Sequence, residues 1–397
     1  MSQTLGKDDI ARACQKCEQK IIDWRREFHA NPEISYQEIW TSGRVKEELD
    51  KMNIPYDTLP DSLGLVARIE GPTPGKTIAL RADMDALPVQ EESDAPYKSR
   101  VDGKMHACGH DAHMAMLLGA ALVLSEFRSS LKGKVFLCFQ SAEEHGGGHA
   151  EISKYLDDNG GVNRIAGLHI WASIKEGTIM LLDGPAMAGA SSFRIQVKGR
   201  GGHASRPDLA KDPIKPACEI VSKISSIPSN FYDVLDHCVI HVGKIQGGTM
   251  SNIFPDTALI EGGIRFFKMD GWGKIMSHIE RIAEGIAKAN DVEVDVKELY
   301  QIVPPVINHS VAVAEARELV SQVEGLELTT GEPMCAAEPY GYFLQKYPGF
   351  FGFLGAMNEE KGIVWAQHNA RFDIDETALR KGCEFMCRCA LDFLSRA

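Results

Sequence analysis

The sequence predicts an α/β protein whose mixed, largely parallel sheet is interrupted by a smaller, inserted α+β domain. Short apolar segments alternate with segments of helical length through the first part of the chain, which is typical of a parallel sheet. Near residue 190 the pattern changes to the strict alternation of half-exposed strands. The length of 397 residues also suits two domains better than one ordinary core.

The first part of the chain supplies helices and buried strands in turn. Apolar residues recur at helical spacing in three segments, 8–29, 36–52 and 110–127. Short apolar runs predict strands at 64–71, 76–82, 134–140 and 165–170. This order indicates an α/β domain, to which the helices and short strands after residue 304 return.

The inserted segment has the pattern of a separate sandwich. Its expected strands are 191–202, 237–248, 256–267 and 292–300, and its expected helices are 212–227 and 270–290. The resulting order, strand-helix-strand-strand-helix-strand, is the split βαβ pattern of a ferredoxin-like fold. We therefore predict a discontinuous domain of residues 1–188 and 304–397 and an inserted domain of residues 189–303.

Composition argues against several classes of function. Hydrophobic residues are 44% and charged residues 25%, as in a globular protein. The net charge is −12 and no dense Lys/Arg cluster occurs, which argues against a nucleic-acid partner. The apolar runs are far too short for a membrane span. The polar N-terminal segment lacks the apolar core of a signal peptide, so we expect a cytoplasmic protein.

The ten cysteines are scattered along the chain, which predicts reduced and mostly buried thiols. Cys14 and Cys17 form a CxxC pair, but the pair lies in a helical pattern and does not follow a strand. Cys383, Cys387 and Cys389 are interpreted as helix-packing residues. A thiol-sensing protein is the alternative that these cysteines leave open.

The stretch HACGHDAHM, residues 106–114, concentrates side chains that bind metals or move protons. The chain has no HExxH motif, so further ligands must come from elsewhere. Functional groups in open α/β sheets gather at the carboxyl ends of the strands. Further metal-binding or proton-transferring side chains lie at or just after the ends of predicted strands: Asp83, Asp85, Glu143, Glu144 and His169. One more, His368, lies in a loop near the end of the chain.

Each of these residues alone has an ordinary interpretation. Adjacent glutamates usually form a solvated turn, and a histidine in an apolar strand usually makes hydrogen bonds within the core. We interpret His106, His113 and Asp83 as supporting residues. Together with Cys108 and His110, however, the residues at the strand ends favour a metal site.

Longer segments carry a more specific signal. In chain order they read FHANPEISYQE, RADMDALPVQE, HACGHDAHMAMLLGAA, FQSAEE, GLHIW, GRGGHASRP, DPI, GGTMSNIFPD and QHNARFDID, and they span nearly the whole chain. They resemble the metal-dependent amidohydrolases that include aminoacylases, hippurate hydrolases, indole-acetyl-amino-acid hydrolases and carboxypeptidase G. The hippurate hydrolase branch is the most similar. The resemblance implies a zinc-peptidase-like α/β domain with an inserted lid domain.

The resemblance also implies a site for two divalent metal ions. The implied ligands are Cys108, His110, Glu144, His169 and His368. Glu143 would be the general base, and His203, in the lid, would donate to the developing oxyanion. Asp85 would orient a ligand histidine. Asn252 and Arg265 resemble residues near the substrate carboxylate.

The charges of these ligands suit the implied chemistry. Two divalent ions carry a charge of +4, and the Cys108 thiolate and the Glu144 carboxylate together carry −2, so the net charge stays positive. A water held between the ions would ionise with a pKa of about 7 instead of 15.7. The cysteine ligand favours zinc, with manganese, cobalt and nickel as alternatives.

The expected reaction is hydrolysis of an N-acyl amino acid to a carboxylic acid and a free amino acid. A dipeptidase or carboxypeptidase of the same fold is the nearest alternative, and a non-catalytic binding protein is an alternative of another class. The inserted sheet has edge strands, which proteins normally cover or pair. The resemblance therefore also implies a homodimer formed through the lid domain.

Two departures from the family pattern concern the substrate pocket. In the stretch AAEPYGYFLQ, Glu338 is kept, but Pro339 and Tyr340 replace the pair that usually follows it. Ala370 replaces a proline after the last ligand histidine. The ligands themselves are unaffected, so we expect an altered acyl or amino-acid preference.

Overall fold

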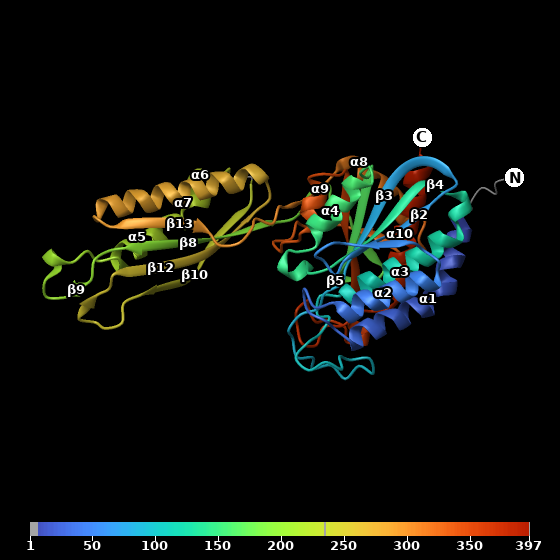
Figure 1. The fold of residues 1–397 in the computed structure, drawn as a ribbon, viewed down its shortest axis with the longest axis horizontal. Helices are drawn as coiled ribbons and strands as arrows, with labels where there is room; N and C mark the ends of the chain where they lie inside the picture. Colours follow the sequence, from blue (N-terminus) through green and yellow to red (C-terminus); the bar gives the residue numbers. More distant parts are fainter. Residues whose placement is uncertain (1–6, 234–235, 397) are drawn as a thin grey trace. The chain divides into compact units, whose positions relative to one another are not determined.

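The computed structural model describes residues 7–233 and 236–396. Contacts within the chain divide it into two compact units (Figure 1). Unit 1 comprises Met1–Ala186, Ile307–Glu332 and Tyr342–Ala397, and unit 2 comprises Met187–Val306 and Pro333–Gly341. Residues 333–341 also belong to unit 2, although the sequence pattern did not predict that a second segment of the chain contributes to this unit. The roles of catalytic and lid domain stay predictions.

Unit 1 is built on an eight-stranded sheet with the order β1-β2-β4-β3-β5-β16-β6-β15. The strands are β1 (Tyr56–Thr58), β2 (Leu65–Glu70), β3 (Thr73–Asp83), β4 (Lys132–Gln140), β5 (Arg164–Lys175), β6 (Thr178–Met180), β15 (Glu327–Thr329) and β16 (Gly349–Met357). The central strands β4, β3, β5 and β16 run parallel, whereas β2 pairs antiparallel with β4 and β6 with β16. The predicted mixed, largely parallel sheet is confirmed.

Helices cover both faces of this sheet. They are α1 (Lys7–Ala30), α2 (Ile39–Lys51), α3 (His110–Glu126), α4 (His149–Asp158), α8 (Ser310–Val320), α10 (Thr377–Ser395) and, across the boundary of the units, α9 (Tyr340–Leu344). Val135 of β4 shares one apolar core with α1, α3 and α10. The next residue, Phe136, packs edge-on against Tyr155 of α4. Because neighbouring side chains of a strand point to opposite faces, the buried run 135–139 of β4 is apolar on both faces.

Unit 2 is a four-stranded antiparallel sheet with the order β10-β12-β8-β13. Its strands are β8 (Gly189–Lys198), β10 (Cys238–Gly247), β12 (Thr257–Phe266) and β13 (Glu293–Glu298), beside the short pair β9 (Gly202–His203) and β11 (Ile253–Phe254). Its helices are α5 (Ile214–Ile224), α6 (Ile227–Phe231) and α7 (Met269–Ala289). Strands β7 (Gly184–Met187) and β14 (Val306–Asn308) pair where the chain passes between the units.

Helices α5 and α7 lie on one face of the unit 2 sheet (Figure 1), and their apolar residues share a core with Phe193 and Ile260 of the sheet. The observed order β8, α5, β10, β12, α7, β13 matches the predicted order of elements. The single helix expected over 212–227 is wrong in detail. It ends at Ile224, and α6 begins at Ile227 with Pro228 in its first turn, a position that proline favours.

Among the described helices, none has the length and apolar character that crossing a bilayer requires.

Candidate metal centre

The five predicted ligands lie together at the carboxyl ends of the central strands of unit 1. The ligand atoms of Cys108, His110 and His169 are all within 4.8 Å of one another, and so are those of Cys108, Glu144 and His368. We call these five residues the strand-end cluster. Because Cys108 belongs to both groups of three, the arrangement offers two neighbouring donor sets that share one sulfur.

Unusual backbone conformations bring these ligands to the strand ends. Gly109 has φ +93° immediately before α3, and a Cβ there would lie 2.5 Å from a side-chain carbon of β5. Glycine therefore lets the chain turn so that His110 begins the helix beside Cys108. Ala142, before the Glu143–His145 turn, and His368 also have positive φ, of 58° and 66°. Such strained residues persist where the surrounding structure fixes them, and they are frequent at functional sites.

Asp85 fixes the turn that carries the two glutamates. Its carboxylate accepts the backbone N–H groups of Glu143 and Glu144, each at 3.0 Å, and the Ser35 hydroxyl at 2.6 Å. His110 Nδ1 donates to the Asp85 carbonyl at 2.8 Å. The neutral His110 ring consequently presents Nε2 as an acceptor or ligand atom. Asp85 thus fixes the His110 ring through its carbonyl and the glutamate turn through its carboxylate, and its role beside a metal ligand stays a prediction.

The remaining ligand atoms suit a metal ion. His110 Nε2 and Glu144 Oε1 are buried 3.9 Å apart, and neither makes a hydrogen bond within the described part of the chain. His368 Nε2 lies 3.5 Å from Glu144 Oε1, and Cys108 Sγ lies 3.5 Å from His169 Nε2. Buried polar atoms without partners are costly, so they indicate a missing partner. Thiolate, imidazole and carboxylate donors together fit a transition ion such as zinc.

Burial and charge set the protonation of the cluster. Burial raises the pKa of the Cys108 thiol well above its ordinary value and lowers the pKa of His169 well below its own. Burial would also lower the pKa of His110, but Asp83 and Cys108 raise it well above the ordinary value. Without an ion, the thiol therefore holds its proton at neutral pH. The His110 ring favours its protonated form as well. Ion binding must displace both protons, since the thiolate and the neutral imidazole are the ligand forms.

His113 and Asp83 support the cluster and satisfy each other. His113 Nδ1 donates to Asp83 Oδ1 at 2.5 Å, and His113 Nε2 accepts the Ile170 N–H at 2.8 Å. Arg81 donates to Asp83 Oδ2 at 2.7 Å. Both ring nitrogens of His113 are therefore occupied, although its position would allow it to share an ion with Asp83 and His110. This geometry favours the supporting role expected for both residues.

Sequence reasoning missed two residues behind the glutamate turn. The Ser35 hydroxyl contacts His145 Nδ1 at 2.9 Å as well as Asp85, and Glu38 Oε1 accepts the Ala142 N–H at 2.7 Å. Burial raises the pKa of Glu38 to about 7. Both residues lie in the segment FHANPEISYQE, which carried part of the family resemblance without a stated role.

His203 lies in unit 2, exposed on the short strand β9 opposite Ile253. Its Nδ1 accepts from the Ser205 N–H at 3.1 Å and contacts the Ser205 hydroxyl at 2.8 Å. In the neutral ring the proton is therefore on Nε2, which makes Nε2 a donor. Asn252 is close to His203, because its carbonyl accepts the Ala204 N–H at 3.0 Å.

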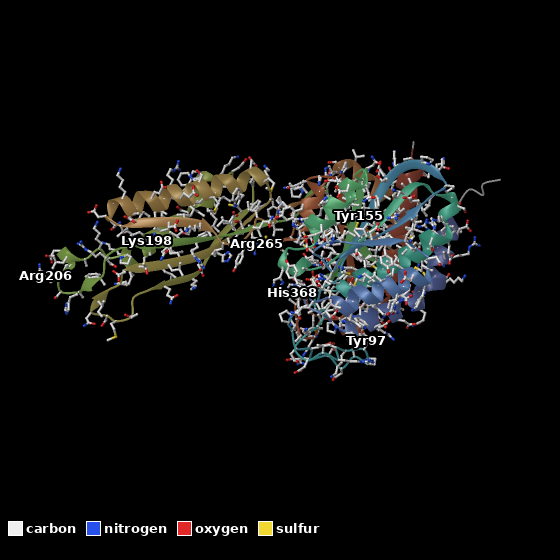
Figure 2. The ribbon with its side chains drawn as sticks, in the orientation of Figure 1. Tyr97, Tyr155, Lys198, Arg206, Arg265 and His368 are labelled. Atoms are coloured by element: carbon white, nitrogen blue, oxygen red, sulfur yellow. The ribbon has the colours of Figure 1, made fainter. Side chains whose placement is uncertain are left out.

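Arg265 lies at the opposite end of the unit 2 sheet. Strand β12 pairs Thr257 with Lys198 near the His203 loop, but it pairs Arg265 with Ala190. At about 3.3 Å per residue, these two ends are about 25 Å apart. Figure 2 labels Arg206, which follows the His203 strand, and Arg265 toward opposite ends of unit 2. The structure thus brings Asn252 near His203 and does not bring Arg265 near either residue.

The departures at Pro339 and Tyr340, and the retained Glu338 before them, are buried. Glu338 is 2% exposed and accepts the Tyr340 N–H at 2.9 Å, and the Tyr340 side chain is 0% exposed. The change to proline and tyrosine therefore alters the packing of this loop and not a surface contact. Ala370, close to His368, accepts the Glu92 N–H at 2.8 Å through its carbonyl.

An α/β domain that gathers metal-binding and titratable side chains at its strand ends has the layout of an active site. Comparison with known proteins agrees. Residues 79–392 match Peptidase family M20/M25/M40. Thermostable carboxypeptidase 2 of Saccharolobus solfataricus is 38% identical over 98% of both chains. N-acetylcysteine deacetylase of Bacillus subtilis is 35% identical over 94% of this chain and 96% of the relative.

Solved structures give the same result. The crystal structure of a Bacillus subtilis protein described as a dinuclear metal-binding peptidase from the M20 family has a TM-score of 0.85 and 32% identity to this chain. The match covers 96% of this chain and 100% of that one. The chain therefore belongs to Peptidase family M20/M25/M40 and is a hydrolase, which confirms the resemblance seen in the sequence.

Proposed function

We propose that this chain is a cytoplasmic amidohydrolase that uses two divalent metal ions to cleave N-acyl amino acids into a carboxylic acid and an amino acid. The observation that carries the proposal is the pair of donor sets that share Cys108, with Glu143 beside them. The deacetylase and the dinuclear peptidase among the relatives support it. We propose zinc as the metal, with manganese, cobalt and nickel as alternatives.

The strand-end cluster would hold the two ions. One would take Cys108, His110 and His169, and the other Cys108, Glu144 and His368. When bound, the ions would supply Lewis acidity that activates a water and polarises the amide carbonyl.

Glu143 is the proposed general base. Its carboxylate is 8% exposed and lies 3.9 Å from His110 Nε2, and Asp85 holds its backbone. The carboxylate would take a proton from the attacking water and deliver it to the leaving amide nitrogen. The Nε2–H of His203 would donate to the carbonyl oxygen as negative charge develops there.

We also propose a homodimer in which unit 2 supplies His203 to a partner subunit. The β10 strand forms an edge of its sheet and exposes Val239 and Ile245, at 46% and 50%. Such edges are normally covered or paired. Strand β8 begins at Gly189, where the chain enters unit 2, and its ten residues reach about 30 Å toward His203. His203 and Asn252 lie near one end of the unit 2 sheet, and Arg265 lies near the other. This separation is compatible with substrate contacts from two subunits.

A carboxypeptidase or dipeptidase is the second candidate, because a carboxypeptidase is 38% identical to this chain. The two functions differ in the acyl side of the cleaved amide, which is a simple acyl group in an N-acyl amino acid and an aminoacyl group in a peptide. The metal-stripped protein would be loaded with zinc, manganese, cobalt or nickel, and assayed with acetyl, benzoyl, indole-acetyl and fatty-acyl amino acids and with free dipeptides. Turnover of the acyl amino acids supports the proposal. Turnover of peptides alone supports the second candidate, and failure with every pair favours a binding protein.

A further inference from the structure

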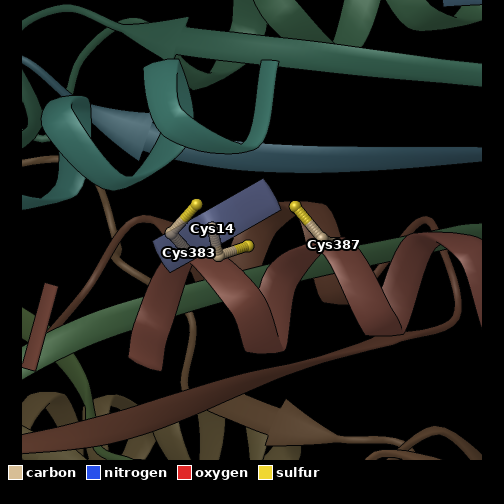
Figure 3. Close-up of side chains that lie close together, drawn as sticks. All are labelled: Cys14, Cys383 and Cys387. Atoms are coloured by element: carbon tan, nitrogen blue, oxygen red, sulfur yellow. The ribbon is translucent and has the colours of Figure 1, made fainter. Parts of the chain in front are cut away.

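Three buried thiols form a second group in unit 1, and none of them belongs to the strand-end cluster. The sulfur atoms of Cys14 in α1 and of Cys383 and Cys387 in α10 are all within 4.8 Å of one another. Figure 3 shows the three side chains at the junction of the two helices. Each is 0% exposed. We call these residues the thiol cluster. The thiol cluster forms because α1, near the N-terminus, packs against α10, near the C-terminus.

The thiol cluster lies in the apolar core of unit 1, and on one side it meets the small residue Gly119 and backbone of α3. A Cβ on Gly119 of α3 would lie 2.9 Å from Cys383 Sγ, so the glycine leaves room for that sulfur. Cys387 Sγ lies 4.0 Å from the Ala120 carbonyl. Cys17, one turn after Cys14, donates its thiol to the Cys14 carbonyl at 3.3 Å and adds a fourth sulfur nearby.

The electrostatic surroundings favour a thiolate. Hydrogen bonds from Cys383 and Cys387 and the positive charge of Arg388 lower the pKa of Cys14 to about 4, although burial opposes the shift. Arg388 is itself buried and donates to Glu384 at 2.6 Å. Three buried sulfurs this close together are an arrangement that a soft cation can bind.

We propose that Cys14, Cys383 and Cys387 bind one thiophilic metal ion, of the class that includes Cu(I), Zn(II) and Cd(II), as a clamp between α1 and α10. Three sulfurs around one ion at about 2.3 Å lie about 4 Å apart, which the observed spacing accommodates. The site has sulfur donors and no carboxylate or imidazole in its group, which argues against magnesium or calcium. Binding forms three sulfur–metal bonds and releases the remaining thiol protons to solvent.

The test uses the whole chain with Cys108→Ser, so that the strand-end cluster contributes no thiolate. After removal of bound metals with a chelator, Cd²⁺ and, separately, Cu(I) would be added without oxygen. Because the thiol cluster is buried, a second sample would be refolded from denaturant with the ion present. We expect about one equivalent bound, a sulfur-to-metal charge-transfer absorption, and a higher unfolding temperature.

Matched variants locate the ion. Cys14→Ser and Cys383→Ser should weaken binding by at least about tenfold and remove most of the absorption, because each deletes a ligand. Cys389→Ser changes a buried cysteine of the same helix outside the thiol cluster and should leave both unchanged. Circular dichroism checks folding, and Cys387→Ala replaces any variant that fails to fold. The proposal is overturned if neither procedure loads one equivalent, if binding survives loss of a cluster thiol, or if Cys389→Ser abolishes it equally. Packing alone then explains the thiols.

Discussion

The strand-end cluster and the His203 region differ in how firmly the structure holds their functional groups. His110 and His169 are buried, and each has one ring nitrogen fixed by a backbone carbonyl, at 2.8 and 2.6 Å. His203 is exposed on a two-residue strand. The hydrogen bonds described above join its ring to Ser205, two residues away. Unit 1 therefore arranges its groups in advance. A donor on unit 2 becomes useful only when it meets a substrate-bearing surface.

Removal of the metals should have the largest effect on hydrolysis, because it takes both proposed ions from the strand-end cluster. Prolonged chelation should abolish hydrolysis, and divalent ions should restore it. Cys108→Ala should lower the content of both ions, since its sulfur serves both donor sets, whereas His368→Ala should deplete mainly one. Elemental analysis measures this, with the exposed Cys218→Ala as the control. Full metal content in Cys108→Ala would contradict the shared-sulfur arrangement.

Loss of the base should come next. Glu143→Gln keeps the shape of the side chain and the backbone bonds to Asp85, so metal content should stay constant. Hydrolysis should fall by about 100- to 10,000-fold, as general-base loss does. Single-turnover rates of metal-loaded protein measure the change, and the exposed Glu360→Gln is the matched control. A variant that retains more than about a tenth of wild-type kcat has its base elsewhere.

Loss of His203, the exposed proposed donor, should lower kcat less than metal removal does and should leave the metal content unchanged. His203→Ala should lower kcat by about 100- to 1,000-fold without loss of metal, as removal of an oxyanion donor does. His237→Ala, an exposed histidine of the same unit, should have no effect. Mixed dimers of His203→Ala and Glu143→Gln subunits should recover up to half of the activity per dimer if His203 serves the partner subunit. Mixing that recovers nothing, or a fully active monomer by light scattering, sinks the trans arrangement.

The smallest effect should come from Glu38, which supports the glutamate turn. Its folded pKa is about 7, above the ordinary value of 4.5, so the folded state keeps a proton that the unfolded chain releases between these values. Stability should therefore fall as pH rises from about 4.5 to about 7. Glu38→Gln keeps the oxygen that accepts the Ala142 N–H and should flatten this slope. Denaturant unfolding of metal-free protein at pH 5 and pH 8 measures it. Parallel slopes for both proteins would assign the pH dependence to other groups.

Local patterns predicted most of the elements, and their failures have local causes. The helix beginning at His110 was predictable because glycine precedes an apolar run. The strands ending near Asp83 and Gln140 were predictable because each contains a short, mainly apolar run. The break at residues 225–226 was missed, since apolar spacing continues across it into α6. The buried run of β16 was not predicted as a central strand, because a short apolar run does not reveal its neighbours.

By itself, the sequence determined the family through its motifs and, through that resemblance, the proposed ligands. It also determined the alternation of helices and strands, because this alternation depends on residue types at fixed spacing. Only the tertiary structure decided that Cys108 is common to two donor sets, that Ser35 and Glu38 hold the glutamate turn, and that Asn252 and Arg265 lie at opposite ends of β12. It also brought Cys14 against α10. Spacing along a chain fixes helix faces and strand faces, whereas contacts between distant segments depend on how those faces pack.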